Sequence, residues 1–382
     1  MDFSLNDDQQ AICAMAQRFA QDALAPHAAE WDETKTFPIE TIKQSAELGL
    51  AAIYTREDVG GSGLGRLDAA LIFEALSEGC VSTAAYISIH NMCCWMIDRF
   101  GSEDLRQKFC PGLASMDLMA SYCLTEPGSG SDAAALRTKA VREGDSYVLN
   151  GSKAFISGAG VSDVYIVMVR TGDAGPKGVS TVLVEKDTPG LSFGANERKL
   201  GWNSQPTAIV TFEDCCIPVA NRIGEEGEGF TFAMQGLDGG RLNIAACSLG
   251  AANAALKATL AYTDERKAFG GRLSDLQAVQ FKLADMATEL EAARTFLYKA
   301  AWKLDQKEPD ATRFCAMAKR FVTDVGFNVV NEALQLHGGY GYLRDYPLER
   351  MLRDVRVHQI LEGANEVMCV IVARDLLKEN RS

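Results

Sequence analysis

Short runs of β-branched residues separate two long helical regions of this 382-residue chain. The runs at 164–170, 179–185 and 207–213 have the length and composition of strands. No helical pattern stands between them, which excludes a βαβ nucleotide-binding fold and predicts an antiparallel sheet in a sandwich or barrel. A hairpin is expected around Asn150-Gly151, because this dipeptide favours a type I′ turn.

The two flanking regions carry apolar residues at helical spacing. The helices predicted before the strands cover 7–20, 39–48, 67–78 and 105–113, and those predicted after them cover 230–261, 276–303, 312–337, 347–358 and 365–377. Long antiparallel helices with apolar faces favour a four-helix bundle. We therefore expect a mainly α protein with a central antiparallel β domain, divided into an N-terminal helical domain (1–118), a middle β domain (119–228) and a C-terminal helical bundle (229–382).

Charge and composition narrow the classes of function. The net charge of −13 provides no basic footprint for phosphates, which argues against nucleic-acid binding. The acidic start has neither a signal-peptide nor a transit-peptide pattern, and no apolar run is expected to reach membrane-spanning length. The 11 cysteines include no C-x-x-C pair, so most should be buried reduced thiols. We expect no metal site, because His90, Cys93 and Cys94 lack a second ligand pair.

One carboxylate near the C-terminus occupies an unusual place. Glu362 follows Ile360-Leu361 and precedes Gly363, at the break between two predicted helices. Apolar surroundings raise the pKa and the basicity of a carboxylate, and a poised base in an apolar cleft can remove a weakly acidic C–H proton. The alternative is an exposed glutamate at a helix junction, since most charged residues face water.

Four further segments could hold a ligand, and each has a simpler alternative. The glycine- and serine-rich loop at 122–132 exposes N–H groups and hydroxyls that suit a ribityl or pyrophosphate group, or it is a surface turn. Residues 155–157 offer an apolar face and a hydroxyl. The glycines at 335–341 permit close backbone approach or only cap a helix. Arg266 suits a phosphate, or it interacts with a helix C-terminus.

Taken together and in this order, these segments resemble the signature segments of the acyl-CoA dehydrogenases. The segments that carry the resemblance are 122–132, 155–157, 266–270, 335–341 and 361–366. The resemblance spans nearly the whole chain and matches its three-part organisation. It implies an FAD-dependent oxidoreductase that acts on the CH–CH bond of an acyl-CoA and passes electrons to an electron-transferring flavoprotein.

The resemblance also assigns roles to individual residues. Glu362 matches the catalytic base. The positions that match FAD-binding segments are Tyr122, Cys123, Leu124, Thr125, Glu126, Pro127, Gly128, Ser129, Gly130, Ser131, Phe155, Ile156, Ser157, Ala364, Asn365 and Glu366. The positions that match FAD contacts from a neighbouring subunit are Arg266, Leu276, Gln277, Gln335, Leu336, His337, Gly338 and Gly339. The positions that match substrate contacts are Ser131, Asp238, Gly239, Gly240, Arg241 and Arg374.

Two positions distinguish this chain within the family. The isovaleryl and long-chain members carry their base on a bundle helix, and the aligned residue here is Gly240, which has no side chain. Glu362 is therefore the only base candidate at either family location. Position 364 is usually a small hydroxyl residue in the family and is Ala364 here, which removes a hydrogen bond to the flavin or at the helix start.

The substrate expectation rests on three segments, 201–206, 241–250 and 357–363, which resemble the short branched-chain members. The expected reaction converts isobutyryl-CoA to methacrylyl-CoA in valine catabolism. A short straight-chain or 2-methyl-branched acyl-CoA is the alternative substrate, because one methylene changes selectivity by only about 1–3 kcal/mol. An acyl-CoA oxidase and a catalytically idle flavoprotein are further alternatives. The resemblance also implies a homotetramer built as a dimer of dimers, in a bacterial cytoplasm or in the mitochondrial matrix of a eukaryote.

Overall fold

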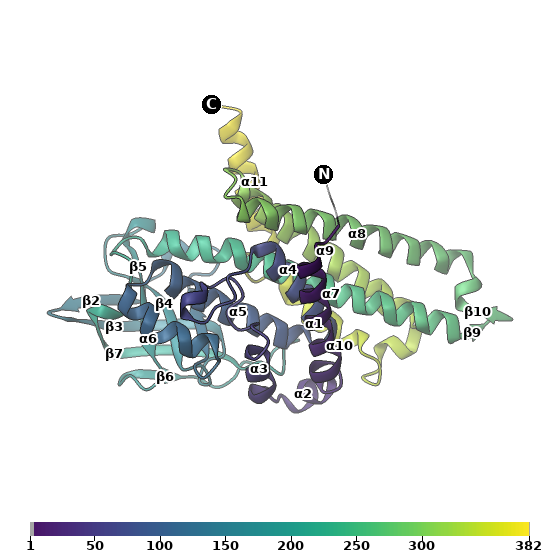
Figure 1. Cartoon of the computed structure of the whole chain (residues 1–382), viewed down its shortest axis with the longest axis horizontal. Helices are drawn as coiled ribbons and strands as arrows, with labels where there is room; N and C mark the ends of the chain where they lie inside the picture. The colour runs from purple at the N-terminus through teal and green to yellow at the C-terminus, as the bar shows by residue number, and fades with distance from the viewer. Residues whose placement is uncertain (1–3, 382) are drawn as a thin grey trace.

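The computed structural model describes residues 4–381, in which a β sheet lies between an N-terminal and a C-terminal set of helices along the chain (Figure 1). The predicted fold class, mainly α with a central β domain, is confirmed. The predicted domain boundaries stay predictions. They fall in the connections between the last N-terminal helix and the first strand, and between the last strand of the sheet and the first bundle helix.

The N-terminal helices are α1 (Asp7–Phe19), α2 (Ala28–Thr34), α3 (Ile39–Ala46), α4 (Arg66–Gly79), α5 (Val81–Phe100) and α6 (Glu103–Ala114). Helix α1 begins with a capping box, in which the Gln9 N–H donates to Asn6 Oδ1 at 2.8 Å and the Asn6 N–H donates to Gln9 Oε1 at 3.3 Å. The sequence patterns predicted α1, α3, α4 and α6 but missed α2 and α5. Helix α5 is buried around most of its circumference, so its sequence has no polar face to reveal a helical period.

The strands of the middle region form one eight-stranded sheet in the order β6-β7-β3-β2-β4-β5-β8, with β1 beside β4. Their bounds are β1 (Ala120–Cys123), β2 (Lys139–Glu143), β3 (Ser146–Ser157), β4 (Val164–Arg170), β5 (Val179–Glu185), β6 (Leu191–Phe193), β7 (Thr207–Pro218) and β8 (Arg222–Ile223). The expectation of a wholly antiparallel sheet is wrong, because β1 and β2 each pair with β4 in parallel. The chain makes a long excursion through β2 and β3 between β1 and β4, which gives the crossover that parallel strands need.

The predicted hairpin at Asn150-Gly151 is also wrong. Strand β3 continues through these residues. The observed hairpin turn is the two-residue connection from β2 to β3, between Glu143 and Ser146, which pair with each other. The register of β3 against β7 shifts between Leu149 and Gly151. Gly151 has φ +145°, and a Cβ there would lie 2.7 Å from Thr138 Cα. The Asn-Gly pair therefore forms a β-bulge, which also needs the conformational freedom of glycine.

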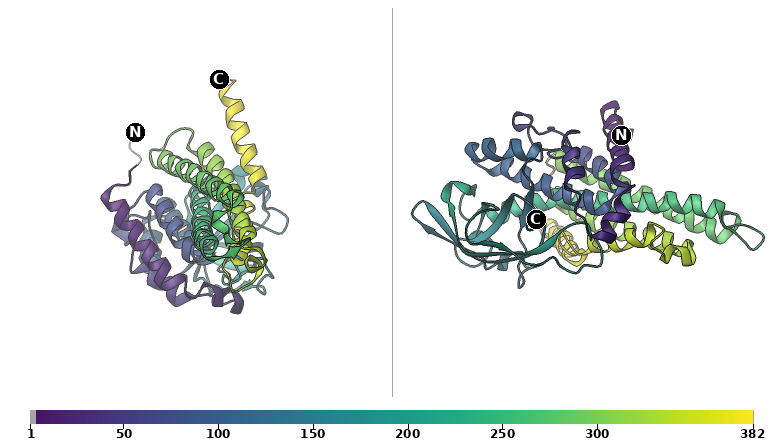
Figure 2. Two further views of the ribbon diagram at one scale, coloured as in Figure 1. Left: turned by 90° about the vertical axis from the view of Figure 1, so that its right-hand side faces the viewer. Right: turned by 90° about the horizontal axis from the view of Figure 1, so that it is seen from below.

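The C-terminal region contains α7 (Gly229–Glu265), α8 (Gln277–Asp305), α9 (Ala311–Leu336), α10 (Leu348–Arg356) and α11 (Asn365–Glu379), with a small hairpin of β9 (Lys267–Ala268) and β10 (Gly271–Arg272) between α7 and α8. All five predicted helices are confirmed, with small changes at their ends. Helices α7, α8 and α9 pack side by side, α10 contacts α9 and α7, and α11 extends from the body of the molecule (Figures 1 and 2).

Four hydrophobic clusters lie within the described residues, and the three larger ones connect these parts. The first is shared by both helical regions and includes Leu24, Phe73 and Leu249. The second lies between the N-terminal helices and one face of the sheet and includes Phe109 and Ile166. The third lies within the sheet region and includes Tyr147, Val167, Val182, Val210 and Ile217. The N-terminal helices therefore pack against both the sheet and the bundle.

Helix α7 is long and apolar enough to cross a membrane, by length and composition only, with a mean hydropathy of 1.3 in its most apolar window. The expectation that no run reaches this length is therefore wrong. The mean hydropathy of α7 is high because the helix is rich in alanine, glycine and leucine, although it also contains Asp238 and Arg241. In this structure 61% of the window is buried inside the protein, as in the core helix of a globular fold. No other helix in residues 4–381 passes the same test.

Candidate active site

Glu362 lies in the turn between α10 and α11, as predicted. A 3₁₀ turn covers Val357–Gln359, and α11 begins at Asn365. Glu362 has φ +56° and the next residue, Gly363, has φ +90°. A left-handed conformation of a residue with a Cβ costs about 1–3 kcal/mol and persists only where the surrounding structure imposes it. Glu362 is therefore held in place by its neighbours rather than by its own backbone preference.

The carboxyl group of Glu362 is turned inward. Its Oε2 atom is buried and has no hydrogen-bond partner among residues 4–381. Burial raises the pKa of Glu362 from its ordinary value to about 7, against the opposing effect of the positive charges on Arg241 and Lys319. The alternative of an exposed junction glutamate is therefore wrong. A carboxylate with a pKa near neutrality has the basicity that proton abstraction requires.

Gly240 on α7 leaves the space that this carboxylate occupies. A Cβ at position 240 would lie 2.6 Å from Glu362 Oε2, which is closer than real atoms approach. At the preceding residue, Gly239, a Cβ would lie 2.2 Å from Nη1 of Arg66. Two adjacent glycines thus allow two charged side chains to lie directly against the α7 backbone.

Arg241 connects α7 to the Glu362 turn. Its Nε donates to the Glu362 carbonyl at 3.3 Å, and its Nη1 pairs with Asp238 at 2.6 Å. Asp238 also accepts a hydrogen bond from the Thr312 hydroxyl at 2.6 Å. Burial raises the pKa of Asp238, while Arg241 acts in the opposite direction. The structure places both predicted substrate residues in a buried network beside Glu362, and their contact with a substrate stays a prediction.

Tyr122 on β1 faces the same region. Its hydroxyl is buried and has no hydrogen-bond partner in the described part of the chain. Burial, followed by the negative charge of Glu362, raises the pKa of Tyr122 well above its ordinary value, so the two side chains are electrostatic neighbours. Buried polar atoms are normally paired, and unpaired ones call for a bound water or ligand. The Tyr122 hydroxyl and Glu362 Oε2 are two such atoms in one region of the protein, which points to a ligand site there.

The two flavin-binding segments predicted in the middle region are brought together. Lys153 on β3 pairs with Glu126 at 2.8 Å and donates to the Leu124 carbonyl at 3.1 Å, and the Ala154 N–H donates to the Thr125 carbonyl at 2.8 Å. These bonds attach the loop after β1 to the middle of β3. The carboxylate of Glu126 also accepts from the N–H groups of Arg137 and Thr138, so its side chain holds the loop in place.

Phe155, which follows Ala154 on β3, has an exposed side chain. It has φ +60° and lies at a second shift of the β3–β7 register, between Lys153 and Ile156. Its side chain is 67% exposed, which is unusual for a large aromatic residue in a strand. Bulges next to active sites redirect side chains. Phe155 therefore presents an apolar face outside the sheet, while Ser157 Oγ accepts from Gln205 Nε2 at 2.7 Å.

The loop itself leaves its backbone accessible. A Cβ at Gly128 would meet no atom within 4 Å, and one at Gly130 would meet only Thr125 Cγ2, at 4.0 Å. Ser129 Oγ donates to the Asp132 carbonyl at 2.5 Å, and Ser131 is exposed. Accessible N–H groups and a free surface are what a phosphate or a polyhydroxylated chain requires. These residues fit a flavin nucleotide.

A second group of predicted residues lies at the far end of the bundle. Arg266 and the segment 335–339 line a pocket of about 510 Å³ together with Tyr262, Leu273, Tyr340 and Leu343. The Arg266 guanidinium lies over the Tyr340 ring, 5.4 Å from its centroid. A Cβ at Gly338 or Gly339 would meet no atom within 4 Å. Leu276 and Gln277 begin α8 at the same end of the bundle. A guanidinium beside an open backbone suits a phosphate group.

Within one chain, the predicted residues near Glu362 and those of the Arg266 pocket lie far apart. Gly240 and Arg266 are 26 positions apart along α7, which is about 39 Å at the rise of an α-helix. Arg374 is exposed on α11, the helix that extends from the body of the molecule (Figure 2), and its contact with a substrate stays a prediction. Within one chain, the predicted positions near Glu362 and the pocket at Arg266 are therefore separate.

The start of α11 shows the effect of Ala364. This residue is the N-cap of the helix, and no side chain forms a hydrogen bond there. The side chain of Asn365 is directed toward α9, where Oδ1 accepts from Lys319 at 2.9 Å and Nδ2 donates to Asp324 at 2.8 Å. Glu366 is exposed. At this end of α11, backbone N–H groups are what remains available for a ligand.

Sequence reasoning missed Lys319 on α9. This lysine is fully buried, and its Nζ donates to the Gly363 carbonyl at 2.7 Å. Burial lowers its pKa to about 8, although Glu362 acts in the opposite direction. Its position was detectable, because it follows the buried Cys315 by four residues and precedes the buried Val322 by three. A lysine on the apolar stripe of a helix is the signal that the sequence offered.

Arg66 on α4 was also missed. Its Nη1 is buried and has no hydrogen-bond partner within residues 4–381. Its guanidinium stacks over the Tyr54 ring at 3.6 Å and lies 4.8 Å from the centroid of Trp95. In the sequence it follows the glycine-rich loop at 60–65, where no feature distinguishes it from a surface arginine at a helix start.

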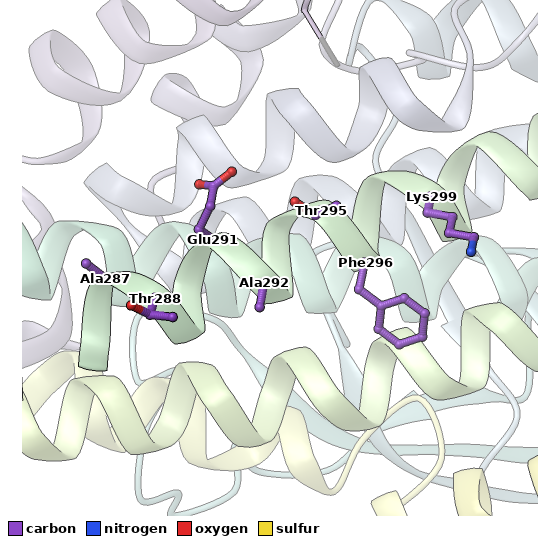
Figure 3. Close-up of a pocket in the computed structure, with 7 residues that line it drawn as sticks. All are labelled: Ala287, Thr288, Glu291, Ala292, Thr295, Phe296 and Lys299. Atoms are coloured by element: carbon purple, nitrogen blue, oxygen red, sulfur yellow. The ribbon is translucent and has the colours of Figure 1, made fainter. Parts of the chain in front are cut away.

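A groove of about 690 Å³ lies away from these residues on α8 (Figure 3). Its lining consists of Ala287, Thr288, Glu291, Ala292, Thr295, Phe296 and Lys299. None of them is a predicted site residue, and no buried unpaired polar atom belongs to this set. The unpaired atoms at Glu362 and Tyr122 therefore lie outside this groove.

No group of three or more metal-ligating side chains occurs within residues 4–381. His90, which stands near Cys93 and Cys94 in the sequence, uses both ring nitrogens inside the protein. Its Nε2 lies 2.9 Å from the Leu113 carbonyl, and its Nδ1 accepts from the Ala120 N–H at 3.2 Å. The eleven cysteines are free, and eight of them are buried.

Comparison with known proteins tests the resemblance. Three family profiles match consecutive parts of the chain: "Acyl-CoA dehydrogenase, N-terminal domain" at 6–117, "Acyl-CoA dehydrogenase, middle domain" at 121–215 and "Acyl-CoA dehydrogenase, C-terminal domain" at 227–377. The chain is 57% identical over 375 residues to the mitochondrial isobutyryl-CoA dehydrogenase of Bos taurus, covering 98% of this chain and 90% of the relative. It is 58% identical over 377 residues to the corresponding protein of Dictyostelium discoideum, with coverages of 98% and 91%.

Solved structures give the same result. A chain from the electron transferring flavoprotein study of Acidaminococcus fermentans superposes with a TM-score of 0.96 at 42% identity, covering 99% of this chain and 100% of that one. PigA with FAD and proline superposes with a TM-score of 0.96 at 34% identity, covering 98% and 99%. The family profiles and the two dehydrogenase relatives confirm the family predicted from the sequence. The chain therefore belongs to the acyl-CoA dehydrogenase family.

Proposed function

We propose that this protein oxidises a short branched-chain acyl-CoA, with isobutyryl-CoA as the substrate and methacrylyl-CoA as the product, as a step of valine catabolism. Its identity of 57–58% to two isobutyryl-CoA dehydrogenases supports this substrate. The observation that carries the chemistry is the buried, unpaired carboxylate of Glu362, for which Gly240 leaves space.

Glu362 is the proposed base that removes the α-proton of the thioester. Its pKa of about 7 makes it basic enough to accept a proton and allows it to be ionised at neutral pH. The α C–H bond is only weakly acidic, so the thioester carbonyl must be polarised as negative charge develops. The family resemblance assigns this task to two donors, the backbone N–H of Glu362 and a ribityl hydroxyl that FAD would supply. Arg241 holds the turn through the Glu362 carbonyl.

FAD is the cofactor of this family, and the residues present fit it. The proposed holding residues in the same chain are the loop at 122–131, Phe155, Ile156 and Ser157, and the helix start at 364–366. When bound, FAD accepts the hydride from the β-carbon. Phe155 offers an apolar surface to a flat ring, and the open glycine backbone of the loop permits close approach. The unpaired hydroxyl of Tyr122 faces the region where flavin and substrate would meet.

The other proposed contacts involve more than one chain or an extended ligand. Arg266, Leu276, Gln277 and residues 335–339 would hold the FAD of a second copy of the chain, a role supported by the distance of about 39 Å along α7 between Arg266 and Gly240. Ser131, residues 238–241 and Arg374 are the proposed substrate contacts. A homotetramer built as a dimer of dimers fits this arrangement.

The proposed electron acceptor is an electron-transferring flavoprotein. Support comes from the similarity to a chain in a structure of that name. The proposed location is the mitochondrial matrix in a eukaryote, which the two mitochondrial relatives support, and the cytoplasm in a bacterium.

An anaerobic flavin-reduction experiment tests the function. Purified yellow protein is mixed in a stopped-flow instrument with isobutyryl-, butyryl-, 2-methylbutyryl- or isovaleryl-CoA, and the loss of flavin absorbance is followed. Fastest bleaching with isobutyryl-CoA is the expected result. Fastest bleaching with butyryl- or 2-methylbutyryl-CoA would replace the substrate and keep the chemistry. Bound FAD that no thioester bleaches would favour the idle flavoprotein, and rapid peroxide release in air would favour the oxidase.

A further inference from the structure

The Glu362 turn is held by cations from two different bundle helices. Arg241 on α7 donates to the carbonyl of Glu362 at 3.3 Å. Lys319 on α9 donates to the next carbonyl along the chain, that of Gly363, at 2.7 Å. Lys319 is 0% exposed, so no water competes for this bond. Two consecutive peptide groups of a left-handed turn are thereby fixed in orientation.

Helix α9 also holds the chain on both sides of the turn. Lys319 Nζ donates to Asn365 Oδ1 at 2.9 Å, and Asn365 Nδ2 donates to Asp324 Oδ1 at 2.8 Å. Gln359 Nε2 donates to the same oxygen of Asp324 at 2.8 Å. The residues before and after Glu362 are therefore attached to one helix, and Lys319 is the member of this set that reaches the turn backbone itself.

The chemistry of Lys319 is unusual for a residue that only fills a core. Burying an ammonium group is unfavourable unless hydrogen bonds and opposite charge compensate for its lost hydration. A methionine of similar length could fill the same apolar stripe without that cost. Here the hydrogen bonds of Lys319 end on Gly363 and Asn365, the residues that follow Glu362, which links the buried charge to the position of the carboxylate.

The charged and titratable groups around the two side chains come from several elements. Four charged groups surround Lys319: Glu362 in the turn, Arg241 on α7, Asp324 on the same helix as Lys319, and Glu366 on α11. Glu362 faces Arg241 and Lys319. On its other sides are two neutral groups, Tyr122 from β1 and Cys93 from α5. Burial, followed by the positive charge of Lys319, lowers the pKa of His358 in the 3₁₀ turn, so this histidine is neutral.

We propose that Lys319 is a positioning residue for the dehydrogenation: it holds the Glu362–Gly363 turn so that the carboxylate remains at Gly240, and it places a positive charge beside that carboxylate. The proposal rests on the proposed role of Glu362 as the base. It goes further by assigning a task to a residue on α9 that touches neither reacting carbon.

Hydrogen exchange tests the positioning role without any turnover. The FAD-loaded Lys319→Met variant is compared with wild type by mass spectrometry of a peptide covering 359–368. The amides of Leu361, Val367 and Met368 are hydrogen-bonded in the structure and report on the turn. We expect exchange there to be about tenfold faster in the variant, because a hydrogen bond from a charged donor is lost. Lys257→Met on α7, which removes the ion pair of this exposed lysine with Glu78 on α4, is the matched control and should leave this peptide unchanged.

The pH dependence of flavin reduction tests the charge. Removing a positive charge beside Glu362 makes ionisation of the carboxyl group harder, so the midpoint of the profile should move to higher pH in Lys319→Met. Lys319→Gln separates the two tasks, because an amide can still donate to the Gly363 carbonyl but carries no charge. We expect Lys319→Gln to restore most of the exchange protection while keeping the shifted midpoint. A residue that only stabilised the bundle would move neither quantity in this pattern.

The possible outcomes are decisive in each case. Wild-type exchange at 359–368 together with a wild-type midpoint, in both variants, would overturn the proposal. If Lys319→Met does not fold, Lys319→Gln decides by its midpoint alone, and an unshifted midpoint overturns the role of the charge. If Glu362→Gln still reduces flavin, the base assignment fails, whereas the exchange experiment still reports whether Lys319 holds the turn.

Discussion

Burial of the Glu362 carboxyl group makes the folded protein sensitive to pH. The pKa of this group is raised from its ordinary value of 4.5 to about 7, chiefly by burial. Between these two values the folded chain binds more protons than the unfolded chain, so stability falls as the pH rises through this window. Above pH 7 the full unfavourable contribution of the ionised group is present.

The variant Glu362→Gln should therefore be more stable than wild type at pH 8. A shift of this size corresponds to at most about 3 kcal/mol. The difference should shrink toward pH 5, where the wild-type group is neutral in the folded protein. Urea unfolding at both pH values measures it. A variant that is less stable than wild type at pH 8 would contradict the burial of an unpaired carboxylate.

The same substitution should stop the chemistry. Glu362→Gln keeps the shape of the side chain but removes its basicity, so FAD and acyl-CoA binding should persist while flavin reduction slows by about 10²–10⁴-fold. Stopped-flow absorbance measures the rate, and titration of the flavin spectrum measures binding. Glu289→Gln, at an exposed position on α8, is the control for loss of one negative charge. Wild-type reduction by Glu362→Gln would rule out the base assignment.

Gly240 gives a second test of the carboxylate position. Gly→Ala within a helix ordinarily stabilises a protein by about 0.5–1 kcal/mol. In Gly240→Ala the new methyl group would lie 2.6 Å from Glu362 Oε2 and must displace it, so flavin reduction should fall even though α7 remains folded. Gly236→Ala on the same helix is the control, because its methyl group would meet only flexible methionine side chains, the Met96 sulfur at 3.2 Å and Met92 at 3.6 Å. Equal reduction rates in the two variants would show that the carboxylate does not depend on this space.

At the scale of elements, the sequence predicted most helices from their apolar spacing and the main strands from their β-branched composition. Helix α5 escaped prediction because it is buried nearly all round, and a helix without a polar face has no period to detect. The Asn150-Gly151 pair was misplaced for another reason. Its local preference for a turn is overruled by the long β3–β7 ladder, which absorbs the glycine as a bulge. Lys319 was missed since its role depends on a contact with a segment 44 residues away.

The start of helix α11 lacks a side-chain cap, and a substitution at its N-cap should increase its stability. Ala364 is its N-cap, and no side chain accepts a hydrogen bond from the first-turn N–H groups. Ala364→Ser should add such an acceptor and stabilise the helix start by about 0.5–2 kcal/mol. Exchange of the amides in the first turn of α11 should slow accordingly, and FAD should dissociate no faster than from wild type. Faster exchange would mean that a hydroxyl does not fit at this position.

At the scale of the whole molecule, the order of helices and sheet followed from sequence periodicity, but the meeting of distant residues did not. Sequence patterns alone do not tell whether Arg266 and Glu362 serve one cofactor within a chain. In the structure, Glu362 lies against Gly240 on α7, and Arg266 follows the end of this helix. The two positions on α7 are about 39 Å apart by helix length. The predicted FAD residues therefore make a single site only if a second copy of the chain supplies the Arg266 pocket.

Mixing two defective variants tests this arrangement. Arg266→Ala should lose FAD on dialysis, since it removes the guanidinium from the distal pocket, and Glu362→Gln should bind FAD without reducing it. In a hybrid dimer whose sites are shared between copies, one site combines an intact Arg266 from the first chain with an intact Glu362 from the second. Random mixing of the two variants should then recover about a quarter of wild-type activity, because half of the dimers are hybrid and each has one complete site. If both residues act within one chain, every site carries a defect and mixing recovers no activity.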